Sequence, residues 1–557
     1  MKILVLVKQI PDISAIKFDQ KTKRIIRSGV KLLFNSYDKK AVEAAVQLSE
    51  KYGYETYAAS MGPPDAAEIL KDSMRMGINH GILLSDRNFA GSDTFVTSHI
   101  LSALVNIINP DIVLTGKSSL DGETSQVPPE TAWMSGYNFL SGVSGIEIME
   151  KSVEVTRDED DGISKYEVPL PAFFSVSEKI NRARQIDPSV KIEDVEVYDS
   201  DITPWKGSQS PTEVVDTFPL NSSRNNKFID FNKFIEILHE AGQGPSDPHR
   251  EYISEPETGD IFLGLAVDDP KISMEISSKI AESTNDKITV IGNIDPVQLQ
   301  GMACHQYVYL EDYSSVSMAK YVAKYIQDNP VRHVLAPSNL NGRDIMSFVA
   351  ASMGLGLTAD CVDIKMENGK MIQYKPSFGG GIIAVIKSKT DPDMATVRKG
   401  MFQVRFMSRS FETTKIRSRA APEYRIIERK KLDSGLRPLD TPVIFGIGTG
   451  VMADDIPKIY DIADKIGASV GATRRVVDMG RIPRQFQIGL TGVSVSPELY
   501  IAIGVSGSDN HVVGTRYAGR VMAVNKNPDA PIFRHSDFGI VMDSHEFIGE
   551  LYSNINH

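Results

Sequence analysis

Short aliphatic runs alternate with longer amphipathic stretches along most of this chain. Residues 3–7, 56–59 and 112–114 are apolar runs of strand length, whereas residues 39–51 and 231–239 repeat apolar positions at helical spacing. Alternation of this kind predicts parallel sheets whose strands are joined by right-handed helical crossovers. We therefore expect an α/β protein.

In the last seventh of the chain, polar residues follow three apolar runs directly. Residues 499–503 lead into a Gly504–His511 loop, residues 521–524 into Asn525-Lys-Asn, and residues 539–542 into Asp543. The carboxyl ends of the strands form the ligand crevice of an open parallel sheet. These polar residues are therefore predicted to converge on one bound molecule.

A glycine turn precedes this region. Residues 443–450 combine a strand with Gly-Ile-Gly-Thr-Gly, and the next helix is expected to bury Ile456, Ile459, Tyr460, Ala463 and Ile466, with Asp454 or Asp455 as cap and Pro457 in its first turn. Such a turn can hold a phosphate on free backbone N–H groups and the helix dipole. It can equally serve only to bring a strand close to a helix. Together with the three polar strand ends, it indicates a nucleotide cofactor.

Composition narrows the class of protein. The 557 residues are 41% hydrophobic and 24% charged, as in ordinary globular proteins, and the net charge of −11 argues against nucleic-acid binding. No apolar run reaches the length of a membrane span, and residues 1–8 are expected to form a buried first strand rather than a signal peptide. Two cysteines, Cys304 and Cys361, exclude a disulfide framework and suit a reducing cytoplasm. We find no metal-ligand spacing and no nucleophile–base constellation.

The length suggests about three domains. We predict a first domain over residues 1–242, a polar, Pro-rich linker over 243–257, a second domain over 258–432 and a third over 433–557, with a hinge near Asp433-Ser-Gly435. The first two domains resemble one another. The strand and loop of residues 110–123 parallel those of residues 330–343, which indicates duplication or fusion, although convergent patterning is an alternative.

The motifs of the third domain carry a resemblance to a known family. Gly471-Ala-Thr-Arg, Gly489-Leu-Thr-Gly, Pro497-Glu-Leu-Tyr, Gly504-Val-Ser-Gly and Asn525-Lys-Asn-Pro-Asp-Ala-Pro-Ile-Phe resemble the FAD domain of the electron-transfer flavoprotein alpha subunit. Gly356-Leu-Thr-Ala-Asp-Cys and Met394-Ala-Thr-Val-Arg-Lys-Gly resemble that subunit's N-terminal domain. Val7-Lys-Gln-Ile-Pro-Asp and residues 116–126 resemble the beta subunit. The chain is similar to a natural fusion of beta and alpha subunits, which implies two related nucleotide-hydrolase-like α/β modules and a C-terminal doubly wound FAD-binding domain.

The resemblance implies a set of FAD-binding positions. Thr473 and Arg474 match a flavin-contacting pair, Thr491 matches a hydrogen-bond donor to flavin N5, and His511 matches a donor near flavin O2. The full set comprises Gly448, Thr449, Gly450, Thr473, Arg474, Ile488, Gly489, Leu490, Thr491, Ser506, Gly507, Ser508, Asp509, Asn510, His511, Asn525, Asp543 and Ser544. The family often has Arg at the position of Thr449 and Gln at that of Leu490, which puts those two contacts in doubt.

The residue types agree with redox chemistry. A reduced flavin carries negative charge at its N1 and O2 edge, and a guanidinium and an imidazole in a low-dielectric site would stabilise that charge. Other interpretations remain open. Arg474 could instead pair with Asp478 one helical turn away, and His511 could be an ordinary loop histidine.

The beta-like region suggests a second nucleotide. Its Gly116-Lys-Ser-Ser-Leu-Asp-Gly-Glu-Thr-Ser-Gln-Val-Pro loop offers hydroxyls and backbone amides suited to phosphate. In the family this loop binds AMP in simple carriers and a second FAD in electron-bifurcating members, and the residues here favour FAD over AMP. The matched positions are Leu6, Asn35, Ser36, Tyr37, Asp38, Met61, Lys117, Ser118, Asp121, Gly122, Glu123, Thr124, Ser125, Gln126 and Val127. A solvated loop without ligand is the alternative.

A third segment matches the partner-recognition loop of the beta subunit. Ile180 stands where the family has a leucine that enters a pocket of acyl-CoA dehydrogenases, and Arg182 and Arg184 flank it. Ile180 could also be a core residue.

The expected function is an electron shuttle rather than a stand-alone catalyst. It would accept electrons from acyl-CoA and related flavin dehydrogenases and deliver them to a membrane quinone oxidoreductase. The alternatives are an NADH-dependent bifurcating flavoprotein with two FADs, which would be an oxidoreductase, and a non-redox adenine-nucleotide-binding module. A fusion is compatible with a monomer.

Overall fold

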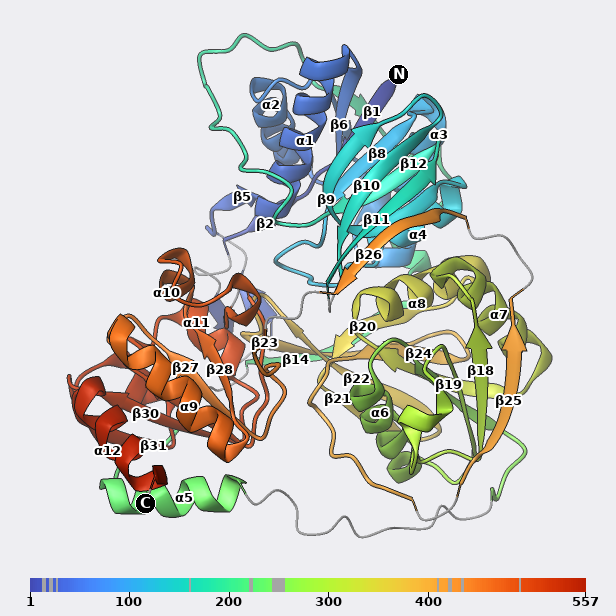
Figure 1. Ribbon diagram of the computed structural model, residues 1–557. Helices are drawn as coiled ribbons and strands as arrows, with labels where there is room; N and C mark the ends of the chain where they lie inside the picture. Colours follow the sequence, from blue (N-terminus) through green and yellow to red (C-terminus); the bar gives the residue numbers. More distant parts are fainter. Residues whose placement is uncertain are drawn as a thin grey trace. The chain divides into compact units, whose positions relative to one another are not determined.

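The computed structural model describes residues 1–12, 17–19, 24–26, 29–159, 162–219, 224–242, 256–407, 410–418, 423–431, 435–489 and 492–556. It divides into two compact units (Figure 1). The first unit holds Met1–Pro219, Arg250–Phe378 and Ile382–Leu432, and the second holds Leu220–His249, Gly379–Gly381 and Asp433–His557.

The first unit begins with a mostly parallel sheet in the order β13-β7-β6-β1-β8-β12-β9-β10-β11-β26. Its helices α1, α2, α3 and α4 come from the crossovers, as the alternating pattern predicts. The elements of this first module are β1 (Lys2–Leu6), β2 (Gln9–Pro11), β3 (Lys17–Asp19), β4 (Arg24–Ile26), β5 (Leu32–Phe34), α1 (Ser36–Tyr52), β6 (Glu55–Met61), α2 (Ala67–Arg75), β7 (His80–Leu84), α3 (Thr94–Ile108), β8 (Ile112–Gly116), α4 (Val127–Ser135), β9 (Asn138–Ile148), β10 (Ser152–Asp158), β11 (Gly162–Pro169), β12 (Ala172–Val176), β13 (Glu196–Tyr198) and β14 (Thr212–Pro219).

Local signals fix the ends of these helices. The Asp93 carboxylate accepts a hydrogen bond from the Val96 amide at the start of α3, and Asn109 ends that helix in the left-handed conformation. Gly53 ends α1 with a φ of 73°, which only glycine adopts without strain.

The second module of the same unit repeats the topology of the first. Its parallel sheet runs β20-β24-β19-β16-β17-β18-β25, which corresponds strand for strand to β9-β12-β8-β1-β6-β7-β13. This agreement confirms the two related modules. The elements are β16 (Ile261–Ala266), α6 (Pro270–Ser283), β17 (Lys287–Gly292), β18 (Gln306–Glu311), α7 (Ser315–Asp328), β19 (Val331–Pro337), α8 (Leu340–Met353), β20 (Leu357–Cys361), β21 (Asp363–Glu367), β22 (Lys370–Ser377), β23 (Ile382–Ser388), β24 (Asp393–Val397), β25 (Glu412–Arg417) and β26 (Arg425–Lys431).

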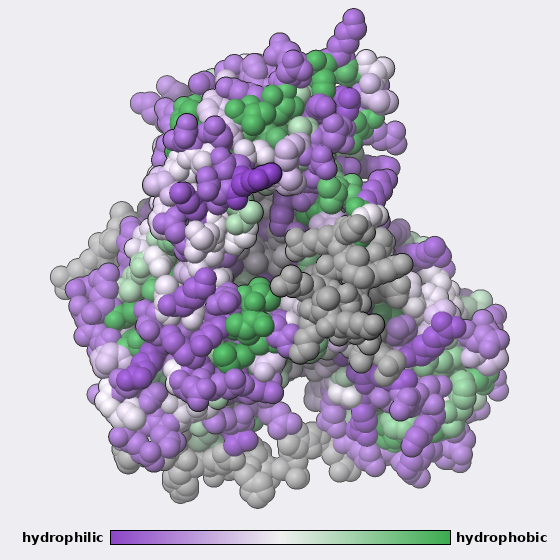
Figure 2. Space-filling model, turned by 180° about the vertical axis from the view of Figure 1, so that it is seen from behind, coloured by the Kyte–Doolittle hydropathy of each residue, from purple (hydrophilic) through white to green (hydrophobic). Residues whose placement is uncertain are grey.

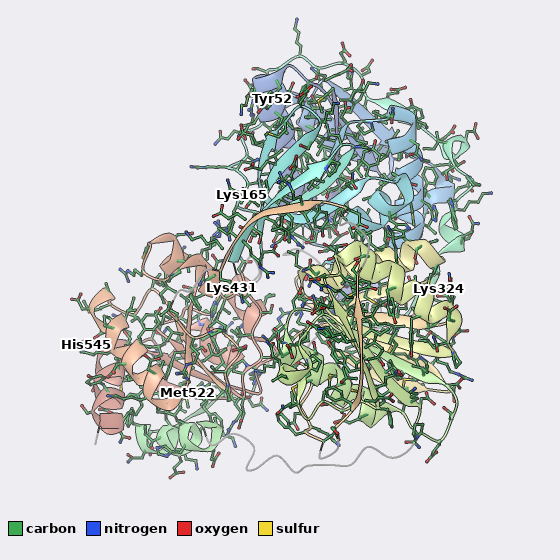
Figure 3. All side chains as sticks on the ribbon, turned by 45° about the vertical axis from the view of Figure 1, so that its right-hand side comes forward. Tyr52, Lys165, Lys324, Lys431, Met522 and His545 are labelled. Carbon is green, nitrogen blue, oxygen red and sulfur yellow. The ribbon has the colours of Figure 1, made fainter. Side chains whose placement is uncertain are left out.

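The two modules exchange strands. β14, the last strand of the first module, pairs with β23 of the second, and β26, the last strand of the second module, pairs with β11 of the first. Lys165 on β11 and Lys431 on β26 are labelled in Figure 3. Because each strand completes its backbone hydrogen bonds in the other module, the two modules form one unit.

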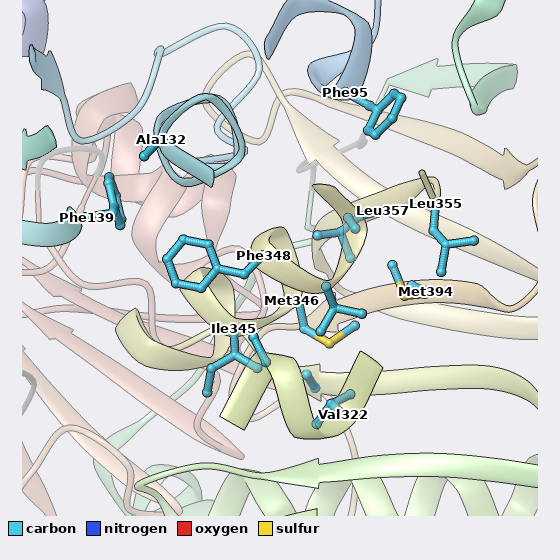
Figure 4. Packing of buried hydrophobic residues seen from close by; sticks show 14 of the residues in the cluster. Phe95, Ala132, Phe139, Val322, Ile345, Met346, Phe348, Leu355, Leu357 and Met394 are labelled. Atoms are coloured by element: carbon cyan, nitrogen blue, oxygen red, sulfur yellow. The ribbon is translucent and has the colours of Figure 1, made fainter. Parts of the chain in front are cut away.

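An apolar core also joins the modules. Phe348 of α8 packs against Trp133 of α4 and Phe139 of β9, with ring centroids 5.4 and 5.9 Å apart. Figure 4 shows Phe139 and Phe348 with Phe95 of α3 and Leu357 of β20, which belong to one buried cluster, and Trp133 packs against that cluster.

The second unit is a parallel sheet in the order β15-β31-β30-β29-β27-β28. Helices α5, α9 and α12 bury one face of it around Phe234, Ile459 and Phe547. The elements are β15 (Lys227–Phe228), α5 (Phe231–Gly242), β27 (Val443–Ile447), α9 (Ile456–Ile466), β28 (Ser469–Ala472), α10 (Arg474–Asp478), β29 (Leu499–Ile503), α11 (Asp509–Val512), β30 (Arg520–Asn525), β31 (Phe538–Val541) and α12 (Ser544–Asn556). Figure 3 labels Met522 on β30 and His545 on α12.

The predicted boundary at residue 242 differs from this division. β15 pairs with β31, and Phe234 of α5 lies 5.1 Å from the Phe547 ring, so the end of the predicted first domain belongs to the C-terminal unit. The physical reason is burial. The apolar face of α5 is covered by α12 and the sheet of this unit. Residues 243–255 of the predicted linker, and residues 433 and 434 of the predicted hinge, lie outside the described residues.

On the face seen in Figure 2, hydrophobic residues form separate small patches among hydrophilic ones. Across the described ranges, no helix has both the length and the apolar character needed to cross a membrane.

Candidate functional site

The polar strand ends of the second unit lie along one edge of its sheet. β27, β29, β30 and β31 are neighbouring parallel strands, so the segments after them, at Gly448, Gly504, Asn525 and Asp543, follow the same sheet edge. The chain runs from β27 outward to β28 and then crosses back to β29. This change of direction is the point at which open sheets bind ligands. The polar strand ends therefore lie along one edge, as predicted, and their convergence on one bound molecule stays a prediction.

The glycine turn after β27 packs backbone against backbone. The Gly448 amide donates to the Ile503 carbonyl at 2.9 Å, and the Gly450 amide donates to Gly504 at 3.1 Å. A Cβ on Gly448 would lie 2.1 Å from the Gly504 oxygen. The glycines are therefore required for close contact between two loops, and these two amides are not available to an anion. Thr449 between them is exposed.

Helix α9 begins at Ile456, and the predicted cap is only partly right. Asp455 occupies the N-cap position, but its side chain makes no capping hydrogen bond. Its buried carboxylate instead lies 2.9 Å from His545 Nδ1. Ser544 donates to the Gly450 carbonyl at 2.6 Å and so ties the start of α12 to the glycine turn.

Thr473 and Arg474 follow the edge strand β28. The Arg474 side chain is 69% exposed, and its Nε lies 3.5 Å from the Asp478 carboxylate. The pairing along the helix that the sequence left open is therefore present. An exposed pair of this kind stabilises little, so the guanidinium can turn toward a bound anion at small cost.

His511 is buried, and both of its ring nitrogens have partners. Nδ1 lies 3.1 Å from the Ile488 carbonyl, and Nε2 lies 2.9 Å from Tyr500 Oη. A carbonyl can only accept, so Nδ1 carries the proton and Tyr500 donates to Nε2. Burial lowers the pKa of His511 to about 4, and the ring is neutral at pH 7. The predicted donation to flavin would require Tyr500 or Ile488 to be displaced.

The remaining predicted FAD residues divide into exposed groups and loop-forming groups. Ser506, Ser508 and Asn510 are exposed at the sheet edge, whereas Ile488, Gly489 and Gly507 are buried. Asn525 donates to the Val505 carbonyl, and Asp543 accepts from the His545 amide. Leu490 and Thr491 lie outside the described residues, and Asp509 is described only as the first residue of α11.

The first unit contains a cavity of about 420 Å³ at the carboxyl ends of β1 and β8. The chain leaves β1 toward β6 and β7 and returns to β8, so this is again the switch point of a parallel sheet. The volume is within the range of small-molecule sites. The lining residues are Leu6, Val7, Lys8, Asp38, Met61, Ser92, Asp93, Thr94, Thr97, Leu101, Thr115, Gly116, Ser118, Ser119, Gly122, Thr124, Ser125, Gln126, Val127, Pro128, Thr212, Val214, Leu357, Thr358, Ala359, Lys375 and Ile386.

Many predicted second-nucleotide residues line this cavity, and the others support it. Leu6, Asp38, Met61, Ser118, Gly122, Thr124, Ser125, Gln126 and Val127 belong to the lining, whereas Asn35, Ser36, Tyr37, Lys117, Asp121 and Glu123 do not. Asn35 donates to the Ser118 carbonyl at 2.9 Å. Asp121 lies 2.8 Å from Lys8 Nζ and so holds the loop to the end of β1.

The loop after β8 has an unusual backbone. Glu123 and Ser125 adopt positive φ values of 50° and 56°, which are uncommon for residues other than glycine. Such strain persists where surrounding contacts enforce it, and it is frequent at ligand sites. Here Gln126 Nε2 donates to the Leu357 carbonyl at 3.0 Å and anchors the loop to the second module.

Two threonines lie in the wall of this cavity. Thr115 of β8 and Thr358 of β20 both line it, and neither Oγ1 has a hydrogen-bond partner among the described residues. Both hydroxyl oxygens are buried in the wall rather than open to the cavity. A buried hydroxyl without a partner is costly.

The equivalent point of the second module is filled by protein. Only Ser338 and Asn339 separate β19 from α8, and Asn339 caps that helix through the Gly342 amide. Asn341 bonds Asp268 at 2.7 Å and accepts from Arg157 of the first module at 2.8 Å. The long loop after β8, which borders the cavity, therefore has no counterpart after β19.

The predicted recognition segment is docked on its own module. Ile180 is partly buried against the core, as the alternative interpretation holds. Arg184 bonds Glu43 and Glu50 of α1 at 2.8 Å each, and Arg182 is exposed. Lys117 of the cavity loop lies 2.8 Å from Glu178 of this segment.

Neither cysteine is suited to chemistry. Cys304 and Cys361 are buried and free, and burial raises the pKa of both thiols. In the part of the chain that the structure describes, no group of three or more His, Cys, Asp or Glu residues could hold a metal ion.

Comparison with known proteins identifies the family. The model of the electron transfer flavoprotein domain matches residues 22–200 and 306–424, and the model of the electron transfer flavoprotein FAD-binding domain matches residues 439–516. The chain belongs to the electron transfer flavoprotein family.

Relatives of both subunit types match. The alpha subunit of Thermoanaerobacterium thermosaccharolyticum is 35% identical over 266 residues, which is 44% of this chain and 77% of that protein. The beta subunit of the same organism is 35% identical over 239 residues, which is 40% of this chain and 90% of that protein. "Lactate dehydrogenase (NAD(+),ferredoxin) subunit LctC" of Acetobacterium woodii is 29% identical over 301 residues, which is 53% of this chain and 70% of that protein. This electron transfer flavoprotein therefore joins a beta-like and an alpha-like region in one chain.

Sequence reasoning missed the cavity residues that other segments contribute. Leu357, Thr358, Ala359, Lys375 and Ile386 come from the alpha-like module, and Thr212 and Val214 come from β14. A charged residue within the apolar strand 371–376 was one available signal for Lys375. The strand pairing that brings β14 here had no local signal.

Proposed function

We propose that this flavoprotein is an electron carrier that accepts electrons from acyl-CoA and related flavin dehydrogenases and delivers them to a membrane quinone oxidoreductase. The observation that supports this most strongly is the convergence of polar strand ends in the segment that matches the family's FAD-binding domain. A bound FAD would supply the redox chemistry. The protein's own residues would bind it, orient it and tune its potential.

Arg474 is the residue proposed to tune the flavin. Its guanidinium is exposed, always charged and only weakly tied to Asp478, so it can face the anionic N1 and O2 edge of the ring. The hydroxyls of Thr473, Ser506 and Ser508 provide further donors at the same sheet edge. This donor set fits an anionic cofactor.

His511 would hold in place the loops proposed to bind the flavin. Through Nδ1 it holds the Ile488 carbonyl, and a Cβ on Gly489 would lie 2.5 Å from the Asn510 oxygen. The two loops are therefore tightly packed. The direct contact of His511 with the flavin stays a prediction, as does the N5 contact of Thr491.

Replacement of Arg474 by alanine tests this role. If the guanidinium favours the one-electron-reduced flavin about tenfold, Arg474→Ala should lower the potential of the first one-electron couple by about 60 mV. Arg475→Ala is the matched control, since Arg475 is its exposed neighbour on α10. Spectroelectrochemical titration gives both potentials, and an equal potential in the two variants would refute the role of Arg474.

The first-unit cavity is proposed to hold a second adenine nucleotide. Its volume and its strained loop fit such a ligand. The residues of the loop favour FAD over AMP. Denaturing the purified protein and separating the released nucleotides by chromatography measures the ratio of FAD to AMP directly.

Electron bifurcation is the second candidate function. It is supported by the Asp-Gly-Glu-Thr-Ser-Gln-Val loop and by the relative whose name includes both NAD(+) and ferredoxin. Anaerobic titration with NADH separates the two functions. Fast reduction of a protein with two FADs would favour bifurcation, whereas a protein that NADH does not reduce would exclude it.

A further inference from the structure

Lys375 is a buried cation in the wall of the first-unit cavity. It lies on β22 of the alpha-like module, and only 4% of the residue is exposed. Its Nζ donates to the Gly122 carbonyl at 2.6 Å and to the Pro376 carbonyl at 3.1 Å. Gly122 belongs to the beta-like loop after β8, so the lysine reaches across to the other module.

The charge of this lysine is not neutralised by a contacting carboxylate. Among the described residues, no Asp or Glu oxygen lies within 4.0 Å of Lys375 Nζ, although Asp360 and Glu123 act on it at longer range. Burial lowers the pKa of Lys375. An ammonium removed from water without an ion-pair partner is destabilising, and such groups persist where they serve a ligand.

The position of Lys375 suits an anion. Lys375, Gly122, Thr115 and Thr358 all line one cavity. A phosphate here would accept a charge-assisted hydrogen bond from the ammonium. The other cavity lysine, Lys8, already pairs with Asp121 at 2.8 Å.

We propose that Lys375 binds the phosphate of the second nucleotide, so that the alpha-like module supplies the cation of a site built mainly by the beta-like module. This inference rests on the proposed second nucleotide. It also gives a reason for the single chain to keep its two modules together, because neither contains the complete site.

A comparison of AMP with adenosine tests the contact. The FAD-loaded, full-length protein is freed of its second nucleotide, and calorimetry measures binding of each probe to wild type, Lys375→Gln and Lys375→Arg. Loss of one charge-assisted hydrogen bond should weaken AMP binding by about 10- to 100-fold in Lys375→Gln. Adenosine should bind as in wild type, and Lys375→Arg should keep most AMP affinity. Lys387→Gln is the control, because Lys387 is exposed on the paired strand β23.

Other outcomes distinguish an error about the second nucleotide site from an error about the role of Lys375. A wild-type protein that carries no second nucleotide and binds neither AMP nor FAD there would refute the second site itself. If wild type binds AMP and Lys375→Gln binds it equally well, only the role of Lys375 is refuted. If Lys375→Gln loses AMP and adenosine to the same degree, Lys375 braces the Gly122 loop and does not bind phosphate.

The pH dependence gives a measurement that does not need the Gln variant to fold. Because burial lowers the Lys375 pKa, the empty site should lose its proton at a lower pH than an ordinary lysine does, and AMP affinity should fall as the proton is lost. Arginine stays charged, so the AMP affinity of Lys375→Arg should stay constant between about pH 7 and pH 10. The AMP phosphate itself no longer titrates in this range. Identical profiles in the two proteins would overturn the proposal.

Discussion

At the scale of single residues, the polar groups around both sites are of two kinds: some are exposed to solvent, and others bond to neighbouring parts of the protein. Arg474 and Ser506 are exposed and can reach a ligand, whereas Asn525 and His511 bond to the backbone of neighbouring loops. Residue type alone does not separate the two kinds. A histidine in a ligand loop has the same sequence signal whether its ring faces the ligand or a buried tyrosine such as Tyr500.

Asp38 should make the stability of the first unit depend on pH. Burial raises its folded-state pKa from 3.8 to about 7, and its carboxylate accepts from the Lys8 amide at 2.8 Å. The folded state therefore holds a proton that the unfolded chain releases above about pH 4. The contribution of Asp38 to stability is greatest below that pH and is lost as pH rises through 7.

Asp38→Asn should remove this pH dependence of the unfolding free energy, which amounts to up to a few kcal/mol. Urea unfolding followed by tryptophan fluorescence between pH 4 and pH 8 measures it, since Trp133 and Trp205 both lie in the first unit. Asp65→Asn, an exposed carboxyl nearby, should keep the wild-type slope. If Asp38→Asn retains the slope as well, the raised pKa is wrong.

At the scale of elements, connections decide which strands make a site. The same order of strands occurs twice in the first unit, and the cavity lies at the long loop after β8, whereas two residues alone separate the equivalent strand β19 from α8. The two modules exchange the strands β14 and β26, and buried polar groups bond one module to the other. Arg157 of β10 donates to Asn341 of α8 at 2.8 Å and lies 3.6 Å from Asp344.

Arg157→Ala should destabilise the first unit by about 3–5 kcal/mol, because it leaves buried carboxylates at Asp344 and Glu159 without their cation. The effect should be smaller at pH 5, since burial raises the pKa of Asp344 to about 6 and protonation removes its charge. Arg425→Ala, which removes the exposed pair of β26 with Glu167, should cost less than about 1 kcal/mol. Denaturant unfolding compares the two, and equal losses would contradict this account.

At the scale of the whole molecule, the flavoprotein consists of two units whose chain segments are interleaved. Residues 224–242 precede the alpha-like module in sequence but pack in the C-terminal unit. The proposed FAD site and the proposed second nucleotide site therefore depend on different cores.

In Phe234→Ala, the two proposed cofactors should be released at different temperatures. Phe234 is fully buried against Phe547, and its truncation should destabilise the second unit by about 3–5 kcal/mol. Flavin should then be released from the second unit at a lower temperature, while the first-unit nucleotide and tryptophan signal persist. Lys233→Ala, exposed on the same helix, should match wild type. Simultaneous loss of both nucleotides in Phe234→Ala would show that the units unfold together.

Sequence reasoning predicted more of the FAD crevice than of the cavity. The strand ends at Gly448, Gly504, Asn525 and Asp543 follow local patterns, and parallel strands necessarily align their carboxyl ends. The cavity depends on Thr358 and Lys375, which lie more than two hundred residues from the loop they complete. A sequence pattern within one element does not indicate a contact between residues so far apart in the chain.

The sequence by itself determined the alternation of strands and helices, the duplicated modules and the polar residues at the ends of the strands, because periodicity and turn chemistry act over a few residues. The tertiary structure alone decided where α5 belongs and that Lys375 and Thr358 of one module line a cavity at the β8 loop of the other. The physical reason is that buried surface and strand pairing are satisfied between distant segments, whose partners are fixed only when the whole chain packs.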